Sequence, residues 1–381
     1  MRLTRRATLL GLGSAMAFGR ASLALAAAPT ERRFVVVLLR GGMDGLAVVV
    51  PRGDRDLAGW RAPLVAEGLL DLGGFWALHP ALAGLHRMYA AGEALAVQAV
   101  ASPDRSRSHF AAQDTLELGA DGHGIADGWL TRAALAVRAP ALAVGAGVPL
   151  LLRGPAPVDD FLPEGRGHPP PDYYAAVLAL HRGDALTGAA MTRALQARSL
   201  SAAALAGSAA PPNADGFPAL AAAAGRLLAA ADGPRIAALE LGGWDTHVRQ
   251  APRLAAALRP LDAGLVALRQ GLGPAWRQTA VLVVTEFGRT VRMNGSLGTD
   301  HGTATVAFVL GGAVAGGRVA GTWPGLAEAR LFERRDLQPT TDVRAIAKGL
   351  LAQHLGLDAA ALARVFPSGG PVTAMRQLLR V

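Results

Sequence analysis

The chain has 381 residues, of which 51% are hydrophobic and 18% charged. This length allows one large α/β domain or two ordinary ones, with a sizeable core. The net charge is +9, but the arginines are scattered rather than gathered into basic tracts, which argues against a nucleic-acid partner. The absence of cysteine excludes thiolate metal sites, cysteine nucleophiles and the cysteine-derived nucleophile of sulfatases.

Residues 1–26 are predicted to be a targeting segment. They combine a basic start, a weakly apolar middle interrupted by glycine, and small residues before an expected cleavage after Ala26. Arg5 and Arg6 resemble the pair of a twin-arginine signal. We therefore expect the twin-arginine translocase to export the chain to a periplasmic or extracellular location, leaving one domain over 27–381. No stable membrane span is expected after cleavage; an uncleaved amphipathic helix is the alternative.

Strands and helices alternate along the rest of the chain. This alternation predicts a mostly parallel sheet, whose strands share one edge at their carboxyl ends. Open α/β sheets bind ligands at that edge, so polar residues directly after strands are candidate site residues. Buried strands are predicted where apolar runs occur, at residues 34–39, 94–100, 141–152, 235–241, 281–284 and 306–310.

The first two strands are followed by polar residues with two possible roles each. Asp44 comes after the first strand in a glycine-rich segment, either as a site residue or within an Asp-Gly turn. Ser106 and Ser108 come after the second strand, shortly before a predicted helix. Ser108 can cap that helix, or it can be a nucleophile favoured by the free amides of the first turn.

Two later strands lead into a denser group of metal-ligand residue types. Asp245 and His247 lie two residues apart, so that both can reach one cation, and an Asp with a neutral imidazole suits Zn or Mn. Their alternative role is an N-cap for the next helix. Glu286 ends the following strand, and Asp300 and His301 close the loop after it. Together these strand ends predict a shared polar or metal site.

The remaining segments are predicted from composition and helix signals. Residues 154–171 are rich in Pro, Gly and Asp and are predicted to be a surface loop or lid. Residues 173–206 are predicted to be helical, and 208–218 form a linker-like break. A last amphipathic helix is expected between Asp342, which would cap it, and Gly356, which would end it.

Five segments in a fixed order resemble a known family. They read RGGMDGL, RSHFAAQD, GGWDTH, TEFGRT and GTDHG, and they lie between residues 34 and 302. Together they resemble the family called domain of unknown function 1501, a branch of the alkaline phosphatase and sulfatase superfamily. The resemblance implies a three-layer α/β/α sandwich with a metal-dependent ester-hydrolysis site. It implies a nucleophile at Ser108 and metal ligands at Asp44, Asp245, His247, Glu286 and His301, with Asp300 beside them.

The sequence departs from the superfamily pattern at three positions. Phe287 replaces a ligand histidine, and Glu286 replaces an aspartate, so one divalent ion (Zn, Mn or Ca) is expected rather than two zinc ions. Ala101 stands where a sulfatase would carry the residue that becomes formylglycine.

Two functions remain open from the sequence. The first is an exported, metal-dependent hydrolase of a small phosphate or sulfate ester. In that enzyme His109 would act as acid or base, and Arg289, with Arg105 or Arg107, would hold the anion. The second is a non-catalytic exported binding or assembly protein on a degenerate hydrolase fold.

Overall fold

The computed structural model describes residues 30–120, 124–145, 147–161, 179, 216–367 and 372–380. The predicted targeting segment lies outside these residues. So do most of the predicted helices over 173–206 and most of the break at 208–218. Within the described residues, no helix combines the length and the apolar character that a membrane crossing requires.

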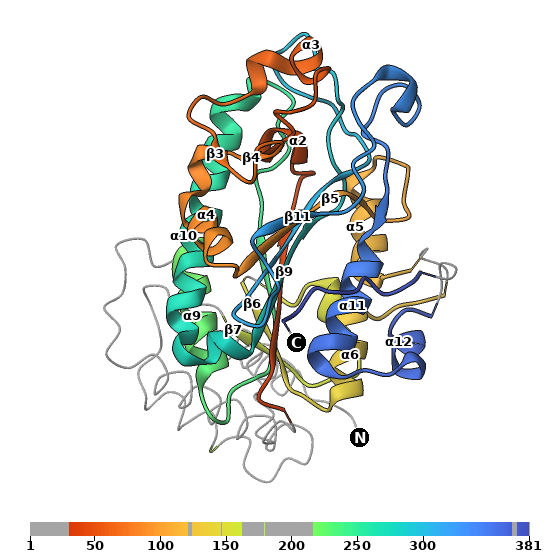
Figure 1. Ribbon diagram of the computed structural model, residues 1–381. Helices are drawn as coiled ribbons and strands as arrows, with labels where there is room; N and C mark the ends of the chain where they lie inside the picture. The colour runs from red at the N-terminus through yellow and green to blue at the C-terminus, as the bar shows by residue number, and fades with distance from the viewer. Residues whose placement is uncertain are drawn as a thin grey trace.

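A nine-stranded sheet forms the centre of the described chain (Figure 1). Its order is β11-β5-β10-β9-β1-β8-β6-β7, and β12 pairs with β5. Only β10 runs antiparallel to its neighbours, so the prediction of a mostly parallel sheet is confirmed. The strands are β1 (Arg33–Leu39), β5 (Ala94–Ala101), β6 (Ala141–Val144), β7 (Val158–Phe161), β8 (Ile236–Leu241), β9 (Thr279–Thr285), β10 (Thr305–Leu310), β11 (Arg318–Ala320) and β12 (Thr341–Asp342).

Helices cover both faces of this sheet, which explains why its central strands are apolar on both sides. Val35 and Val37 of β1 pack into one core and Phe34 and Val36 into the other. Figure 1 shows the helices in two layers, which confirms the three-layer sandwich. One layer holds α4 (Ala83–Ala90), α9 (Phe217–Ala229) and α10 (Gln250–Leu272); the other holds α5 (His109–Leu118), α6 (Trp129–Val137), α11 (Val343–Leu355) and α12 (Ala359–Val365).

A smaller unit follows β1 and lies at the top of Figure 1. It consists of two short helices and a three-stranded antiparallel sheet of order β2-β4-β3. A third cluster of buried apolar residues packs Leu46, Val50 and Leu57 of this unit against Ala99 and against apolar residues from the segment 291–337. The elements are α2 (Gly45–Val48), β2 (Val49–Val50), α3 (Leu57–Arg61), β3 (Leu70–Asp71) and β4 (Ala77–Leu78).

Two predicted segments differ from the structure. The strand expected over 141–152 ends at Val144, because Gly145 turns with a φ of 143° and a 3₁₀ turn follows at Leu150–Leu152. The loop expected over 154–171 contains the edge strand β7. By contrast, the predicted ends of α11 are confirmed. Asp342 accepts a hydrogen bond from the amide of Arg344, and Gly356 ends the helix in the left-handed conformation.

His354 on α11 makes the stability of the fold depend on pH. Burial lowers its pKa to about 4, although its Nε2 lies 2.9 Å from the carbonyl oxygen of Arg33. Between pH 6.5 and pH 4, His354 therefore binds a proton in the unfolded chain but stays neutral in the folded chain. As the pH is lowered across this range, the free energy of unfolding should fall by about 3 kcal/mol.

Urea unfolding of the wild type and of His354→Gln at pH 7, 5.5 and 4.5 tests this expectation. Gln keeps a donor for the Arg33 carbonyl but does not titrate, so its stability should fall less steeply. Equal slopes for the two proteins would show that His354 is not the group responsible.

Candidate metal centre

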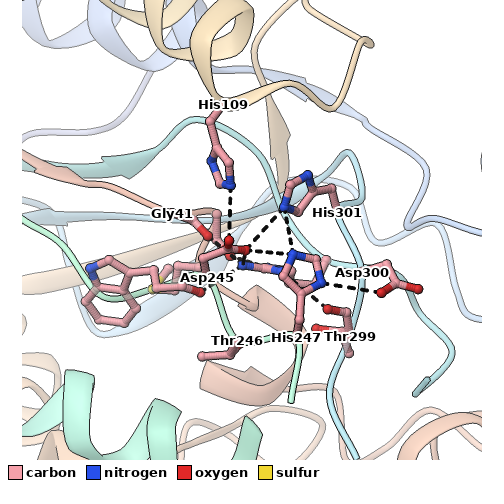
Figure 2. Close-up of polar contacts among 12 residues, drawn as sticks. Gly41, His109, Asp245, Thr246, His247, Thr299, Asp300 and His301 are labelled. Carbon is pink, nitrogen blue, oxygen red and sulfur yellow. Dashed lines mark hydrogen bonds and ion pairs between the residues drawn. The ribbon is translucent and has the colours of Figure 1, made fainter. Parts of the chain in front are cut away.

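The candidate site residues come together at the carboxyl edge of the sheet. Strands β5, β8 and β9 run in the same direction, so the loops that follow them meet there. His109 begins α5 after β5, and Asp245 and His247 follow β8. His301 closes the loop that leaves β9 and returns through the antiparallel β10. Figure 2 shows these four side chains pointing toward one another.

The polar atoms at the centre are spaced like ligands of one ion. His247 Nε2 lies 2.9 Å and His301 Nε2 3.2 Å from Asp245 Oδ1, and the two nitrogens are 3.0 Å apart. His109 Nε2 lies 3.5 Å from the other oxygen of Asp245. A tetrahedral zinc with bonds of about 2.0–2.1 Å places its ligand atoms roughly 3.3 Å apart. These spacings therefore fit a divalent cation.

Each histidine has an oxygen acceptor at the far side of its ring. An acceptor at Nδ1 requires the proton there, which leaves the Nε2 lone pair free to bind a metal. His109 Nε2 is buried and has no hydrogen-bond partner, as expected of a ligand atom. The distances from Nδ1 are 2.8 Å from His109 to Glu286 Oε1, 3.4 Å from His247 to Asp300 Oδ1, and 2.9 Å from His301 to the Arg107 carbonyl oxygen.

Arg107 presents its carbonyl oxygen to His301 from an unfavourable backbone conformation. Its φ of 60° lies in the left-handed region, which non-glycine residues seldom occupy. Its guanidinium Nε donates to the fully buried Asp336 at 2.9 Å, and its Nη2 to Glu333 at 2.5 Å. These ion pairs fix the conformation that presents the carbonyl to His301.

The sequence indicated that Glu286 is a direct metal ligand. In the structure it instead contacts the far side of the His109 ring. It is buried and lies beside His109, while the amide of Gly41 and the side chains of Gln113 and Thr285 donate to it at 2.8–2.9 Å. Burial raises the pKa of Glu286, but the hydrogen bonds from Gln113, its own amide, His109 and Thr285 outweigh burial and lower it. The ionised carboxylate thus orients His109.

Asp300 has a similar position relative to His247. Besides its contact with the imidazole, it accepts a hydrogen bond from Asn294 Nδ2 at 3.1 Å. The hydrogen bond from Asn294, followed by the contact with His247, lowers the pKa of Asp300. The predicted ligands Asp300 and Glu286 are therefore both placed to orient histidines.

Asp44 is the predicted ligand that the structure does not bring to the centre. Its buried carboxylate pairs with Arg61 and accepts a hydrogen bond from Gln250 Nε2 at 2.5 Å. It also caps α2, accepting from the amides of Leu46 and Ala47. All its lone pairs face protein donors, so the turn-and-cap alternative describes Asp44 better than metal ligation.

The arginines expected to hold an anion are bound to the protein itself. Arg289 is buried, and it donates to the carbonyl oxygens of Gly41 and Gly42 at 2.6 and 2.7 Å and to Asp245 Oδ1 at 2.5 Å. Burial raises the pKa of Asp245, but Arg289 outweighs this effect and lowers it. Arg105 donates to nearby carbonyl oxygens, and Arg107 to carboxylates. Arg289 therefore positions Asp245 rather than a substrate.

Ser108 occupies the N-cap position of α5 but does not cap it. Its side chain makes no capping hydrogen bond, and its amide donates to Ser106 Oγ at 3.1 Å. Ser106 in turn donates to Asp104 Oδ1 at 2.8 Å. Of the two serine hydroxyl groups, that of Ser108, which is next in the chain to His109, is thus less engaged in hydrogen bonds.

One feature of the centre differs from what the sequence indicated. His109 was expected to be an acid or base, whereas its Nε2 points at Asp245 with the ligand atoms. Its position after a strand end, like that of Asp245, was the available signal. The ring of Phe287 packs 4.8 Å from both His109 and His301. Phe287, which the sequence indicated in place of a ligand histidine, thus packs its apolar ring against two of the histidines.

The fold and the site define a three-layer α/β protein with a candidate metal centre at the carboxyl edge of its sheet. The chain belongs to the DUF1501 family of proteins of unknown function, whose model matches residues 92–366. A comparison with curated proteins found no match.

Solved structures resemble this chain only remotely. A phosphonate monoester hydrolase of Agrobacterium radiobacter is 12% identical, with a TM-score of 0.37 and coverage of 76% of this chain and 70% of that one. A protein of the alkaline phosphatase superfamily from Vibrio parahaemolyticus is 11% identical, with a TM-score of 0.37 and coverage of 97% and 80%. Ps i-CgsB in complex with k-i-k-neocarrahexaose is 10% identical, with a TM-score of 0.36; this chain spans 66% of its length, and 74% of this chain is covered. At these TM-scores the likenesses carry no argument about the site.

Proposed function

We propose that this protein is a metal-dependent hydrolase of a phosphate or sulfate ester. The observation that carries the proposal is the convergence of three imidazole Nε2 atoms on the Asp245 carboxylate, with an acceptor fixing each Nδ1. Histidines held in this way are typical of metal ligands. Because Arg5 and Arg6 precede a weakly apolar segment that ends in small residues, we also propose that the chain is exported by the twin-arginine route.

His109, Asp245 and His301 would hold the ion, and His247, whose Nε2 lies 2.9 Å from Asp245 Oδ1, would add a fourth ligand. Imidazole with one carboxylate suits zinc or manganese, whereas calcium prefers oxygen ligands, so zinc and manganese fit this set better. Burial lowers the pKa of His301 and so favours the neutral form that a ligand requires. When bound, the ion polarises an ester oxygen and lowers the pKa of a nearby hydroxyl or water.

Ser108 is proposed to be the nucleophile. Its hydroxyl precedes α5, whose first amides have no side-chain cap and can donate to an anionic ester oxygen. Attack by Ser108 Oγ on phosphorus or sulfur would form a serine ester, break the bond to the alcohol oxygen and pass the serine proton, directly or through water, to the alcohol that leaves. Water would then hydrolyse the serine ester. His109, as a metal ligand, is no longer proposed to be the acid or base.

One observation favours a second candidate, a non-catalytic exported binding protein. Arg105, Arg107 and Arg289, which were expected to hold the anion, all donate to the protein itself. A site without these arginines loses the bidentate clamp that suits phosphate or sulfate.

Metal analysis together with Ser108→Ala separates the two candidates. The purified full-length protein should hold about one divalent ion, and ion in 100-fold excess over its Kd should stabilise it by about 2.7 kcal/mol. Ser108→Ala should keep the ion and the melting temperature, because no capping bond is lost, but should lose most hydrolysis of 4-nitrophenyl phosphate and sulfate. Hydrolysis that is absent in both proteins, with the ion bound, would favour the binding protein. A melting temperature insensitive to chelator would contradict the metal centre.

A further inference from the structure

Three large apolar side chains are exposed on the segments that carry the candidate metal centre. Phe110 is 86% exposed, Leu297 55% and Val248 44%. Among the described residues, the other exposed large apolar side chains are Phe75 and Leu135. A single exposed apolar residue needs no explanation, but several around one polar site mark a binding surface.

Two of the three directly follow a residue of the centre in the chain. Phe110 follows His109 in the first turn of α5, and Val248 follows His247. The rings of His109 and His247 both pack against His301, with centroids 4.5 and 4.7 Å away. The segments that carry Phe110 and Val248 therefore meet at the centre.

Leu297 belongs to the loop that runs beside Val248. The amide of Arg249 donates to the carbonyl oxygen of Ser296 at 2.9 Å, and the amide of Gln250 to that of Leu297 at 2.8 Å. Leu297 has a φ of 56°, a conformation that is unfavourable for leucine and that Asn or Gly adopts readily. An exposed leucine thus stands at a position that suits a small polar residue.

We propose that Phe110, Val248 and Leu297 form an apolar rim that binds the non-reacting part of the substrate. The ester would then be an amphiphile, with its charged group at the metal centre and an alkyl or aryl group against the rim. This inference rests on the proposed function, because Phe110 and Val248 directly follow residues that would hold the ion and Leu297 lies in the loop beside Val248. Burying a phenyl ring contributes roughly 10- to 100-fold to binding, enough for the rim to select such substrates.

Calorimetry on the metal-loaded, full-length protein tests the rim with methylphosphonate and octylphosphonate, which the protein cannot hydrolyse at an ester bond. Octylphosphonate should bind at least about 10-fold more tightly. The double variant Phe110→Ser/Leu297→Asn should remove most of that difference, with the loss falling on octylphosphonate. The matched controls Phe75→Ser and Leu135→Asn, which change exposed apolar residues elsewhere, should keep the difference.

Several results would overturn the rim. These are equal affinity for the two phosphonates, the absence of binding by either, or an equal loss for both in the double variant. A dimer that the double variant dissolves would assign the surface to a second copy, and lost binding to phosphatidylcholine vesicles would assign it to a membrane. If octylphosphonate binds more tightly than methylphosphonate but neither 4-nitrophenyl phosphate nor 4-nitrophenyl sulfate is hydrolysed, the proposed hydrolase activity is contradicted and the apolar rim is supported.

Discussion

Replacing Asp245 with Asn is expected to release the metal and to lower ester hydrolysis by more than about 100-fold. The Asp245 carboxylate lies within 3.5 Å of all three histidine Nε2 atoms, so it is the shared member of the proposed ligand set. Changes to residues that only orient ligands already cost about 10- to 100-fold in metal affinity, and loss of a charged ligand should cost more. Asn still accepts the hydrogen bond from Arg289, so the fold should persist.

The measurements are metal content after dialysis and hydrolysis at saturating metal. Asp300→Asn is the graded control, because Asp300 contacts His247 from the far side of its ring. It should weaken metal binding by about 10- to 100-fold, less than Asp245→Asn does. A larger effect at Asp300, or an unchanged metal content in Asp245→Asn, would refute the proposed ligand set.

Replacing Arg61 with Met should destabilise the fold by about 3–5 kcal/mol. The change removes the ion-pair partner of Asp44 and leaves a carboxylate that is 1% exposed without its cation. Arg61 itself has two buried nitrogens, Nε and Nη1, without hydrogen-bond partners. Removing both charges in Arg61→Met/Asp44→Asn should therefore recover part of the loss, because the Asn oxygen still accepts from the amides of Leu46 and Ala47.

Denaturant unfolding measures these free energies. Arg269→Met is the matched control, since it breaks an exposed ion pair with Glu93 and should cost at most about 1 kcal/mol. The single change Asp44→Asn should leave metal affinity unaltered. If it instead lowers metal affinity as strongly as Asp245→Asn, Asp44 would return to the ligand set that the sequence indicated.

The sheet was predictable from the sequence because its strands are apolar on both faces. Runs such as 34–39 and 306–310 have few alternatives to burial, and glycine and aspartate mark where several of them end. The placement of Asp245, His247 and His301 followed from strand direction alone. The segment before residue 30 was equally distinctive, but its cleavage and the domain boundary that it implies stay predictions.

The roles of the acidic residues could not be predicted in the same way. Whether a carboxylate faces a metal or an arginine depends on contacts far along the chain, such as Asp44 with Arg61 and Gln250. Likewise, the sequence alone does not distinguish a ligand role for Glu286 from its observed contact with His109. Position after a strand identifies the edge of the sheet, but it does not fix the direction of a side chain.

The contacts that orient the histidines also bear on when the centre forms during folding. The contact between His109 and Glu286 joins residues 177 positions apart, and that between His301 and Arg107 spans 194 positions. Closing loops of this length costs several kcal/mol of chain entropy, and contacts so distant form late. An ion that needs these histidines in place can bind only after the β5, β8 and β9 segments have docked. Metal loading would therefore follow folding, and incompletely folded chains would not retain the ion.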